Sequence, residues 1–206
     1  MTSAFSPTST KLCVALTGSS VEEQVGQAHA AKARGADLVE IRLDYLDEFE
    51  PSTHVAELLQ ACPLPSIVTC RPVWEGGKYE GTEESRLASL ALAVQLHAPF
   101  VDVELLAAKP FFAGLDSLPP SPTKVIVSSH NYRCTPPDAE LFDVLAAARA
   151  AGAAVAKLVT TATTDADAWR MLAALRASVA WGLPTIAFAM GERGQATRLL
   201  AGVAGG

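Results

Sequence analysis

Strand-like and helix-like segments alternate along all 206 residues, and this alternation constrains the fold more than any other feature. Short apolar runs, typical of buried strands, are separated by amphipathic stretches of helical length. No two successive strands are joined by a hairpin turn. The pattern therefore predicts a parallel sheet that is covered by helices.

The boundaries of these elements are set by capping and ending residues. Strands are expected at 12–16, 37–42, 66–71, 100–104, 124–129, 153–161 and 185–189. Helices are expected to begin at Ser20 with Glu23 completing a capping box, near Thr53, at Thr82, at Thr135–Asp138, at Thr164 and near Gly194. Residues 105–122 are interrupted by prolines and give only a weak signal. Together these segments make seven βα units.

An open doubly wound sheet and a (β/α)₈ TIM barrel both fit seven βα units. The turn at 17–20 lacks the GxGxxG pattern, so a dinucleotide site is poorly supported. Charged residues at or near the carboxyl ends of different strands are Glu40, Arg42, Arg71, Glu104, His130 and Lys157. A barrel gathers those ends around one mouth, where its active sites lie. We predict an α/β TIM barrel, as one domain over residues 11–206 after a short disordered leader at 1–10.

Composition excludes several classes of function. The formal charge of −6 argues against a general nucleic-acid binder. No apolar run approaches the roughly 18 residues of a membrane span. The four cysteines form no CxxC pair and no metal-ligand spacing, which predicts packed, reduced thiols. A reducing compartment such as the plastid stroma or the cytoplasm is expected, and the sequence does not distinguish between them.

The run at 153–161 places one lysine, Lys157, among small and β-branched residues. A lysine is rarely buried without a partner or a purpose. Desolvation lowers the pKa of an amine, and the neutral amine attacks carbonyl groups. The alternative is a lysine that ends an edge strand and extends to water. This stretch alone supports both readings equally.

The other candidate residues also have ordinary structural explanations. Glu40 and Arg42 project to one face of a strand and could form a structural ion pair. His130 could be a satisfied structural histidine, and Arg71 and Glu75 could be ordinary loop residues. Together with Lys157, they match the needs of imine chemistry on an anionic keto acid. In that chemistry Lys157 forms the imine, His130 transfers protons, Glu75 orients the histidine and arginines clamp the substrate's oxygens.

Five motifs, spread in order from about residue 11 to 206, resemble type I 3-dehydroquinate dehydratase. They are Glu40-Ile41-Arg42-Leu43-Asp44, Arg71-Pro72-Val73-Trp74-Glu75-Gly76-Gly77, Ser128-Ser129-His130-Asn131-Tyr132, Lys157 with Thr160-Thr161-Ala162, and Met190-Gly191-Glu192-Arg193-Gly194. The closest likeness is to the dehydratase domain that plants and algae fuse to shikimate dehydrogenase. The resemblance implies a TIM barrel that converts 3-dehydroquinate to 3-dehydroshikimate in the shikimate pathway, which leads to chorismate and the aromatic amino acids, without a metal or cofactor.

The resemblance also implies roles for individual residues. By motif, Lys157 matches the Schiff-base lysine, His130 the general acid/base and Glu75 the carboxylate beside that histidine. The residues that match substrate-binding groups are Glu40, Arg42 and Arg71 for the ring hydroxyls and Arg198 for the carboxylate. The implied partners are the small-molecule substrate and either a second copy of the chain or a shikimate dehydrogenase, fused or associated.

The sequence ends at Gly206, before the eighth strand, lid loop and final helix of the family. We therefore expect a barrel truncated to about seven βα units. Two alternatives to an active dehydratase stay open. One is a catalytically impaired relative with a binding or structural role, and the other is a class I aldolase-like barrel that shares the lysine.

Overall fold

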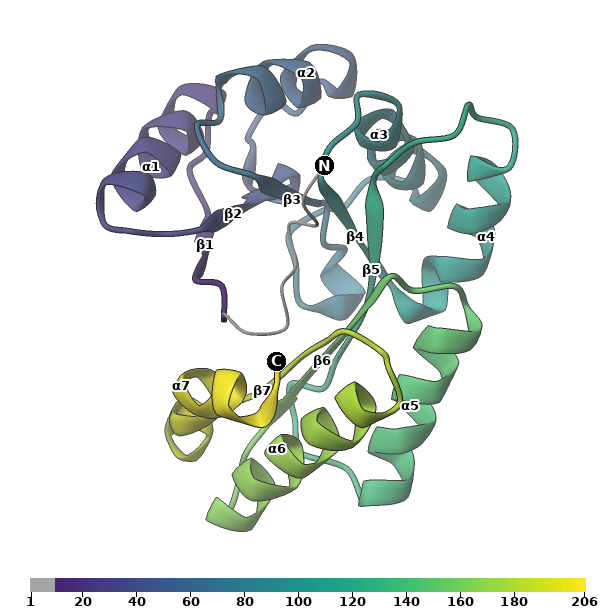
Figure 1. Cartoon of the computed structure of the whole chain (residues 1–206). Coiled ribbons are helices and arrows are strands. Elements are labelled where there is room, and N and C mark those ends of the chain that lie inside the picture. The colour runs from purple at the N-terminus through teal and green to yellow at the C-terminus, as the bar shows by residue number, and fades with distance from the viewer. Residues whose placement is uncertain (1–9) are drawn as a thin grey trace. The chain divides into compact units, whose positions relative to one another are not determined.

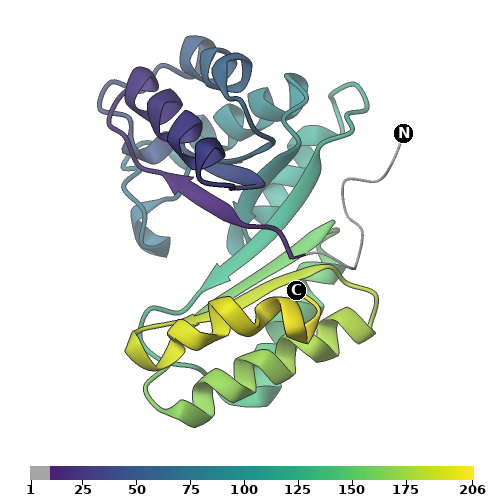
Figure 2. The same ribbon diagram turned by 60° about the vertical axis from the view of Figure 1, so that its left-hand side comes forward.

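The computed structural model describes residues 10–206, so the expected leader at 1–10 lies outside the described residues except for Thr10. Two compact units are distinguished, Lys11–Ile126 and Val127–Gly206. They are called the N-terminal unit and the C-terminal unit. In both, strands and helices alternate along the chain, as Figures 1 and 2 show.

The N-terminal unit contains four complete βα repeats. Its strands are β1 (Cys13–Leu16), β2 (Leu38–Arg42), β3 (Ser66–Thr69), β4 (Phe100–Glu104) and the start of β5 (Lys124–His130). Its helices are α1 (Val21–Ala33), α2 (Pro51–Ala61), α3 (Glu83–Gln95) and α4 (Leu105–Leu115), with the short helices η1 (Leu43–Tyr45) and η2 (Val73–Glu75). Strands β1 to β4 pair in parallel, and Glu40 lies opposite Ala15 and Ile67.

The C-terminal unit contains the end of β5 and two further parallel strands. These are β6 (Val155–Thr161) and β7 (Thr185–Met190), which pair with Lys157 opposite Ile186. The helices of this unit are α5 (Asp138–Ala150), α6 (Asp165–Ala180), η3 (Glu192–Gly194) and α7 (Gln195–Ala204). The strand order is sequential from β1 to β7. The predicted alternation and the parallel pairing are therefore confirmed.

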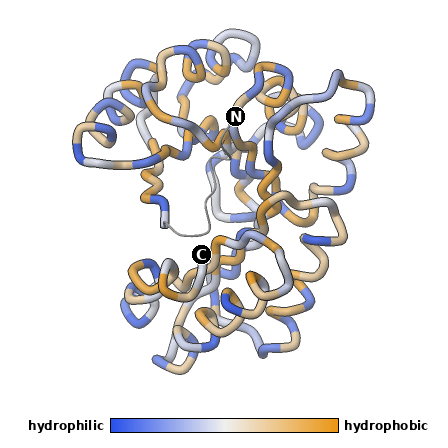
Figure 3. Tube along the Cα trace, in the orientation of Figure 1, coloured by the Kyte–Doolittle hydropathy of each residue, from blue (hydrophilic) through white to orange (hydrophobic). Residues whose placement is uncertain are grey.

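Most predicted helix signals act as expected. The hydroxyls of Ser20 and Thr82 accept the N–H groups of Glu23 and Ser85, each at 3.2 Å. The predicted capping box at Ser20 is only half formed, because the Glu23 carboxylate accepts the N–H of Ser19 at 2.7 Å instead. The glycines that follow α1, α5 and α6 have positive φ, as a left-handed helix end requires. Figure 3 shows hydrophilic and hydrophobic residues mixed along these helices.

Three predicted boundaries were wrong. The weak segment contains helix α4, which accommodates Pro110 and buries Ala107, Ala108 and Phe111. Helix α2 begins at Pro51, two residues early, because Glu50 caps it by accepting the N–H of Ser52. Helix α5 begins at Asp138 and is not capped by Thr135.

Thr135 has a different role from the predicted helix cap. Its buried hydroxyl lies 2.8 Å from the hydroxyl of Thr160 and donates to the carbonyl of Thr161 at 3.0 Å. These bonds tie the loop after β5 to the end of β6. A threonine that precedes prolines at the start of a helix can thus bond to a neighbouring strand instead of capping the helix.

The cysteine prediction was correct in one respect and wrong in another. None of the four cysteines, all of which lie within residues 10–206, forms a disulfide. Only Cys70 is buried, however, whereas Cys13 and Cys134 are exposed and Cys62 is partly exposed. Burial raises the pKa of the Cys70 thiol, which therefore stays protonated and unreactive.

Candidate active site

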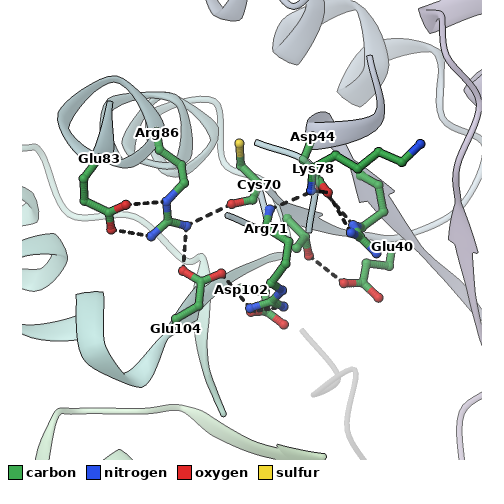
Figure 4. Close-up of polar contacts among 11 residues, drawn as sticks. Glu40, Asp44, Cys70, Arg71, Lys78, Glu83, Arg86, Asp102 and Glu104 are labelled. Carbon is green, nitrogen blue, oxygen red and sulfur yellow. Dashed lines mark hydrogen bonds and ion pairs between the residues drawn. The ribbon is translucent and has the colours of Figure 1, made fainter. Parts of the chain in front are cut away.

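Asp44 organises the end of β2 and the loop at 71–79. Its buried carboxylate accepts the Arg42 guanidinium at two points, Nε to Oδ1 at 2.9 Å and Nη2 to Oδ2 at 2.7 Å. The same oxygens accept the backbone N–H groups of Arg71 (3.2 Å) and Lys78 (3.1 Å). Figure 4 shows these contacts around Asp44. Burial alone would lower the pKa of Arg42, but the bonds to Asp44 raise it, so the guanidinium keeps its charge.

The loop that carries Glu75 is closed by backbone hydrogen bonds. Tyr79 donates its N–H to the carbonyl of Arg71 at 3.1 Å, and Val73 donates to the carbonyl of Tyr79 at 3.2 Å. Gly77 passes so close to the backbone of Arg71 that a Cβ atom there would overlap it. The tight loop needs this glycine, and it leaves Glu75 half-buried at the end of η2.

Arg71 lies in a cluster of buried charges. Its side chain is almost fully buried, and it contacts two fully buried carboxylates of β4: Asp102 at 2.8 Å and Glu104 at 2.6 Å. Burial disfavours the charged guanidinium, but Asp102, Glu104 and Glu40 raise the pKa of Arg71 above its usual range. Arg71 is therefore permanently charged and fixed in direction by β4.

Glu40 belongs to the same cluster of charged groups. It projects from β2, and its carboxylate accepts the hydroxyl of Thr69 at 2.8 Å from the neighbouring strand β3. Figure 4 shows Glu40 beside the Arg71 and Asp102 side chains. Arg42 forms its two-point contact with Asp44, whereas an ion pair with Glu40 was the structural alternative considered from the sequence. The N-terminal unit thus brings together Glu40, Arg42 and Arg71.

Lys157 is a half-buried residue in the C-terminal unit. It is the third of the seven residues of β6, so it lies inside the strand, four residues before the carboxyl end near which it was expected. Its neighbours along the strand, Ala156 and Leu158, are buried and face the other way. Opposite Lys157 on β7 lies Ile186, and two positions further on Phe188 lies opposite Val159.

His130 is the last residue of β5, which extends one residue beyond its predicted end at 129. The N–H of the next residue, Asn131, donates to the carbonyl of Val159 at 2.8 Å and continues the parallel ladder of β6. This register places His130 beside Val159, on the face of the sheet that carries Lys157. The imidazole stacks on the ring of Tyr132, with centroids 6.0 Å apart and planes 16° apart.

Arg198 reaches the same face from α7. Its guanidinium lies 3.9 Å from the centroid of the Phe188 ring. It also lines an open hollow of about 360 Å³, together with Ala189, Met190, Gly191, Glu192 and Gln195. A guanidinium stacked on an aromatic ring keeps its edge N–H groups for an anion. The C-terminal unit thus gathers an amine, an imidazole and a guanidinium on one side of β5–β7.

Three charged residues of the N-terminal unit that contact Arg42, Arg71 or Glu104 were not predicted from the sequence. Asp44 stands at the end of the Glu40 motif, where a carboxylate two residues after Arg42 could have been recognised. Asp102 lies two residues before Glu104, so both project to one face of β4. Arg86 is fully buried in α3, although its charge gives no sign of burial in the sequence. The predicted pairing of Glu75 with His130 stays a prediction.

Residues 10–206 contain neither a helix suited to span a membrane nor a cluster of potential metal ligands. None of the helices in that range combines the length and apolar character that crossing a bilayer requires. Within the same range, no group of three or more histidine, cysteine, aspartate or glutamate side chains could hold a metal ion.

Comparison with known proteins gives a consistent picture. Residues 12–206 match the family described as type I 3-dehydroquinase. The chain is 42% identical over 196 residues to the chloroplastic bifunctional 3-dehydroquinate dehydratase/shikimate dehydrogenase of Arabidopsis thaliana, covering 95% of this chain and 32% of that protein. It is 39% identical to the 3-dehydroquinate dehydratase of Desulfotalea psychrophila, covering 93% of this chain and 82% of the relative.

Solved structures agree with the fold. A type I 3-dehydroquinate dehydratase from Clostridium difficile superposes with a TM-score of 0.84 at 21% identity, over 94% of this chain and 80% of that one. The 3-dehydroquinate dehydratase of Aquifex aeolicus gives a TM-score of 0.77 at 25% identity, over 95% and 87% of the two chains. The predicted TIM-barrel class, with seven parallel βα units, is confirmed.

Proposed function

Because the chain belongs to the type I 3-dehydroquinase family, we propose that it dehydrates 3-dehydroquinate to 3-dehydroshikimate through an imine on Lys157. The motif resemblance that pointed to this family is confirmed, and its place in the shikimate pathway follows from the family. The observation that best supports these catalytic roles is that Lys157, His130 and Arg198 lie on one face of the C-terminal unit.

The reaction needs a neutral amine, a proton carrier and an electron sink. Lys157 adds to the C3 carbonyl and loses water to give a protonated imine. The imine withdraws electrons, so His130 can remove a proton from C2 and form an enamine. The enamine electrons then expel the C1 hydroxyl, which leaves as water after taking the proton from His130. Water hydrolyses the imine, so the net change is the loss of one water molecule.

The motif resemblance assigns the remaining charged groups to parts of the substrate. Arg198 suits the carboxylate, because a guanidinium binds it at two points. Glu40, Arg42 and Arg71 are already held by Thr69, Asp44 and the β4 carboxylates, and we assign them to the ring hydroxyls. Glu75 is assigned to the His130 imidazole, where a carboxylate fixes the tautomer and stabilises the imidazolium.

Borohydride reduction in the presence of 3-dehydroquinate tests the proposal directly. An imine on Lys157 would be reduced to a stable secondary amine, and peptide mass spectrometry would locate the added mass on the peptide containing Lys157. Lys157→Met should show no adduct and no turnover. The exposed residue Lys109 on α4 supplies the matched control. Lys109→Met should still form the adduct on Lys157 and should still turn over 3-dehydroquinate.

Other results separate the alternatives. Binding of substrate without an adduct or turnover would indicate a catalytically impaired relative and would contradict the proposal. An adduct with aldol donors, but none with 3-dehydroquinate, would point to aldolase-like chemistry.

We also propose that the chain acts fused to, or associated with, a shikimate dehydrogenase, or as a homodimer. The first is supported by the bifunctional relative of Arabidopsis thaliana. Analytical ultracentrifugation of the chain alone and with a shikimate dehydrogenase separates the two assemblies. A chain that sediments as a monomer and does not bind the dehydrogenase would refute both the homodimer and the association with that enzyme.

A further inference from the structure

Arg86 is the bulkiest of the fully buried side chains among residues 10–206, and the proposed reaction leaves it unused. It projects from α3, whose other buried residues are Ser89, Leu90, Ala93 and Val94. The Nη1 atom of Arg86 lies 2.6 Å from Oε2 of Glu104 and donates to the carbonyl of Cys70 at 2.9 Å. Nε and Nη2 donate to the two oxygens of Glu83, as Figure 4 shows.

Glu104 thereby stands between two arginines. Its Oε1 atom contacts Arg71 at 2.6 Å, and its Oε2 atom contacts Arg86 at 2.6 Å. All these side chains are at most 4% exposed, so an unbalanced charge among them would be costly. Asp102 and Glu104 would outnumber the Arg71 guanidinium by two charges to one. Arg86 supplies a second positive charge, so the four buried side chains Arg71, Arg86, Asp102 and Glu104 carry no net charge among themselves.

We propose that Arg86 is a positioning residue for the dehydratase reaction: it keeps Glu104 ionised and aimed, so that Glu104 and Asp102 hold Arg71 toward the substrate. The inference rests on the proposed function. Arg86 also binds the carbonyl of Cys70, the residue directly before Arg71, so it fixes the backbone and the side chain of Arg71 together.

The charges around Glu104 support this role. They are Arg71, Arg86 and Asp102, with Glu83 and the Cys70 thiol around Arg86. Burial raises the pKa of Glu104, and the two arginines oppose that rise. Without Arg86 one of these two opposing charges is lost, so the pKa of Glu104 is expected to rise further and the protonated form is favoured. A protonated Glu104 would accept only a weaker hydrogen bond, and Arg71 would lose part of its support.

Arg86→Met is the direct test, with Arg176→Met on the exposed face of α6 as the matched control. Arg86→Met should raise KM for 3-dehydroquinate by up to about 100-fold while kcat changes little, because misplacing a binding group by about 1 Å has effects of that size. Arg86→Lys keeps the charge and should restore most of KM. In the double variant Arg86→Met/Glu104→Gln, the added loss from Arg86→Met should be much smaller than in the unmodified protein, since Arg86 acts on the Arg71 side chain through Glu104 and only its bond to the Cys70 carbonyl is independent of Glu104.

Infrared spectroscopy tests the charge without using catalysis. Arg86→Met should show the carbonyl band of a protonated buried carboxyl at a higher pH than the unmodified protein does, and Arg86→Met/Glu104→Gln should not. The inference is overturned if Arg86→Met lacks this band, if its KM equals that of Arg176→Met, or if the two single effects on KM add in the double variant. Should the unmodified protein lack dehydratase turnover, the proposed function fails, and the infrared band alone decides the role of Arg86. If Arg86→Met does not fold, Arg86→Lys decides: a KM as high as that of Glu104→Gln overturns the inference.

Discussion

Asp44→Asn is expected to lower the free energy of unfolding by about 3 kcal/mol. The substitution keeps the shape of the side chain but replaces one carboxylate oxygen by an NH₂ group, which would face the Arg42 guanidinium. Two charge-assisted hydrogen bonds are lost, at about 1.5 kcal/mol each. Each carboxylate oxygen accepts one guanidinium N–H and one backbone N–H, so the amide would lose one bond of each kind and keep the other two. The cost therefore stays at the low end of the roughly 3–5 kcal/mol for breaking a buried pair.

Urea denaturation measures this loss. With a denaturant slope of about 2 kcal/mol/M, the midpoint should fall by roughly 1.5 M. Asp165→Asn supplies a control, because Asp165 is 78% exposed in its ion pair with Arg193 and such pairs contribute about 0–1 kcal/mol. Equal midpoints for the two variants would refute the conclusion that Asp44 holds the loop at 71–79. A shifted midpoint without a fall in kcat/KM would refute its connection to the site.

Two further predictions concern backbone space and pH. Gly77→Ala should displace the loop at 71–79 and reduce kcat/KM, because the Cβ of the alanine would overlap the Arg71 backbone. Gly26 in α1 has no neighbouring atom within 4 Å of the place where a Cβ would stand. Gly26→Ala should therefore stabilise the protein by about 0.5–1 kcal/mol in the same urea assay. Equal behaviour of the two alanine variants would contradict the model of a tight loop. Burial would raise the pKa of Asp167, but N–H and hydroxyl bonds from Thr163 and Thr164 dominate and lower it from 3.8 to about 2. The stabilisation from the ionised Asp167 is complete above about pH 4 and is lost as pH falls through about 2. In Asp167→Asn, the free energy of unfolding should therefore depend less steeply on pH between these values. An unchanged slope would contradict the conclusion that Asp167 is the group that titrates there.

The order of elements was predictable because each strand and helix has local signals of its own. Ser20, Thr82 and Thr164 each cap a helix with their own hydroxyl, and Gly152 ends one through its positive φ. Thr135 misled the prediction because tertiary hydrogen bonds to β6 outweigh the local capping preference. Pro110 misled it too, since burial of apolar side chains from α4 compensates for one missing helical hydrogen bond.

The candidate residues were predictable only as far as strand periodicity and motif resemblance reach. Lys157 and His130 stand out in sequence because each is a polar group set in a buried strand. Arg86 and Asp102 do not, because their roles depend on partners that are distant in the chain. Spacing cannot show that four buried charges from three different elements balance one another.

The location of Lys157 inside β6 has a consequence for partial unfolding. Its backbone is flanked by strands on both sides, whereas Glu75 is held by the hydrogen bonds of a surface loop. Amide hydrogen exchange of the loop at 71–79 should therefore be faster than that of β6, because loops open locally at lower free energy than core strands. Mild denaturant would release the proposed partner of His130 first and leave the nucleophile in place. Imine formation would then outlast proton transfer as the protein begins to unfold.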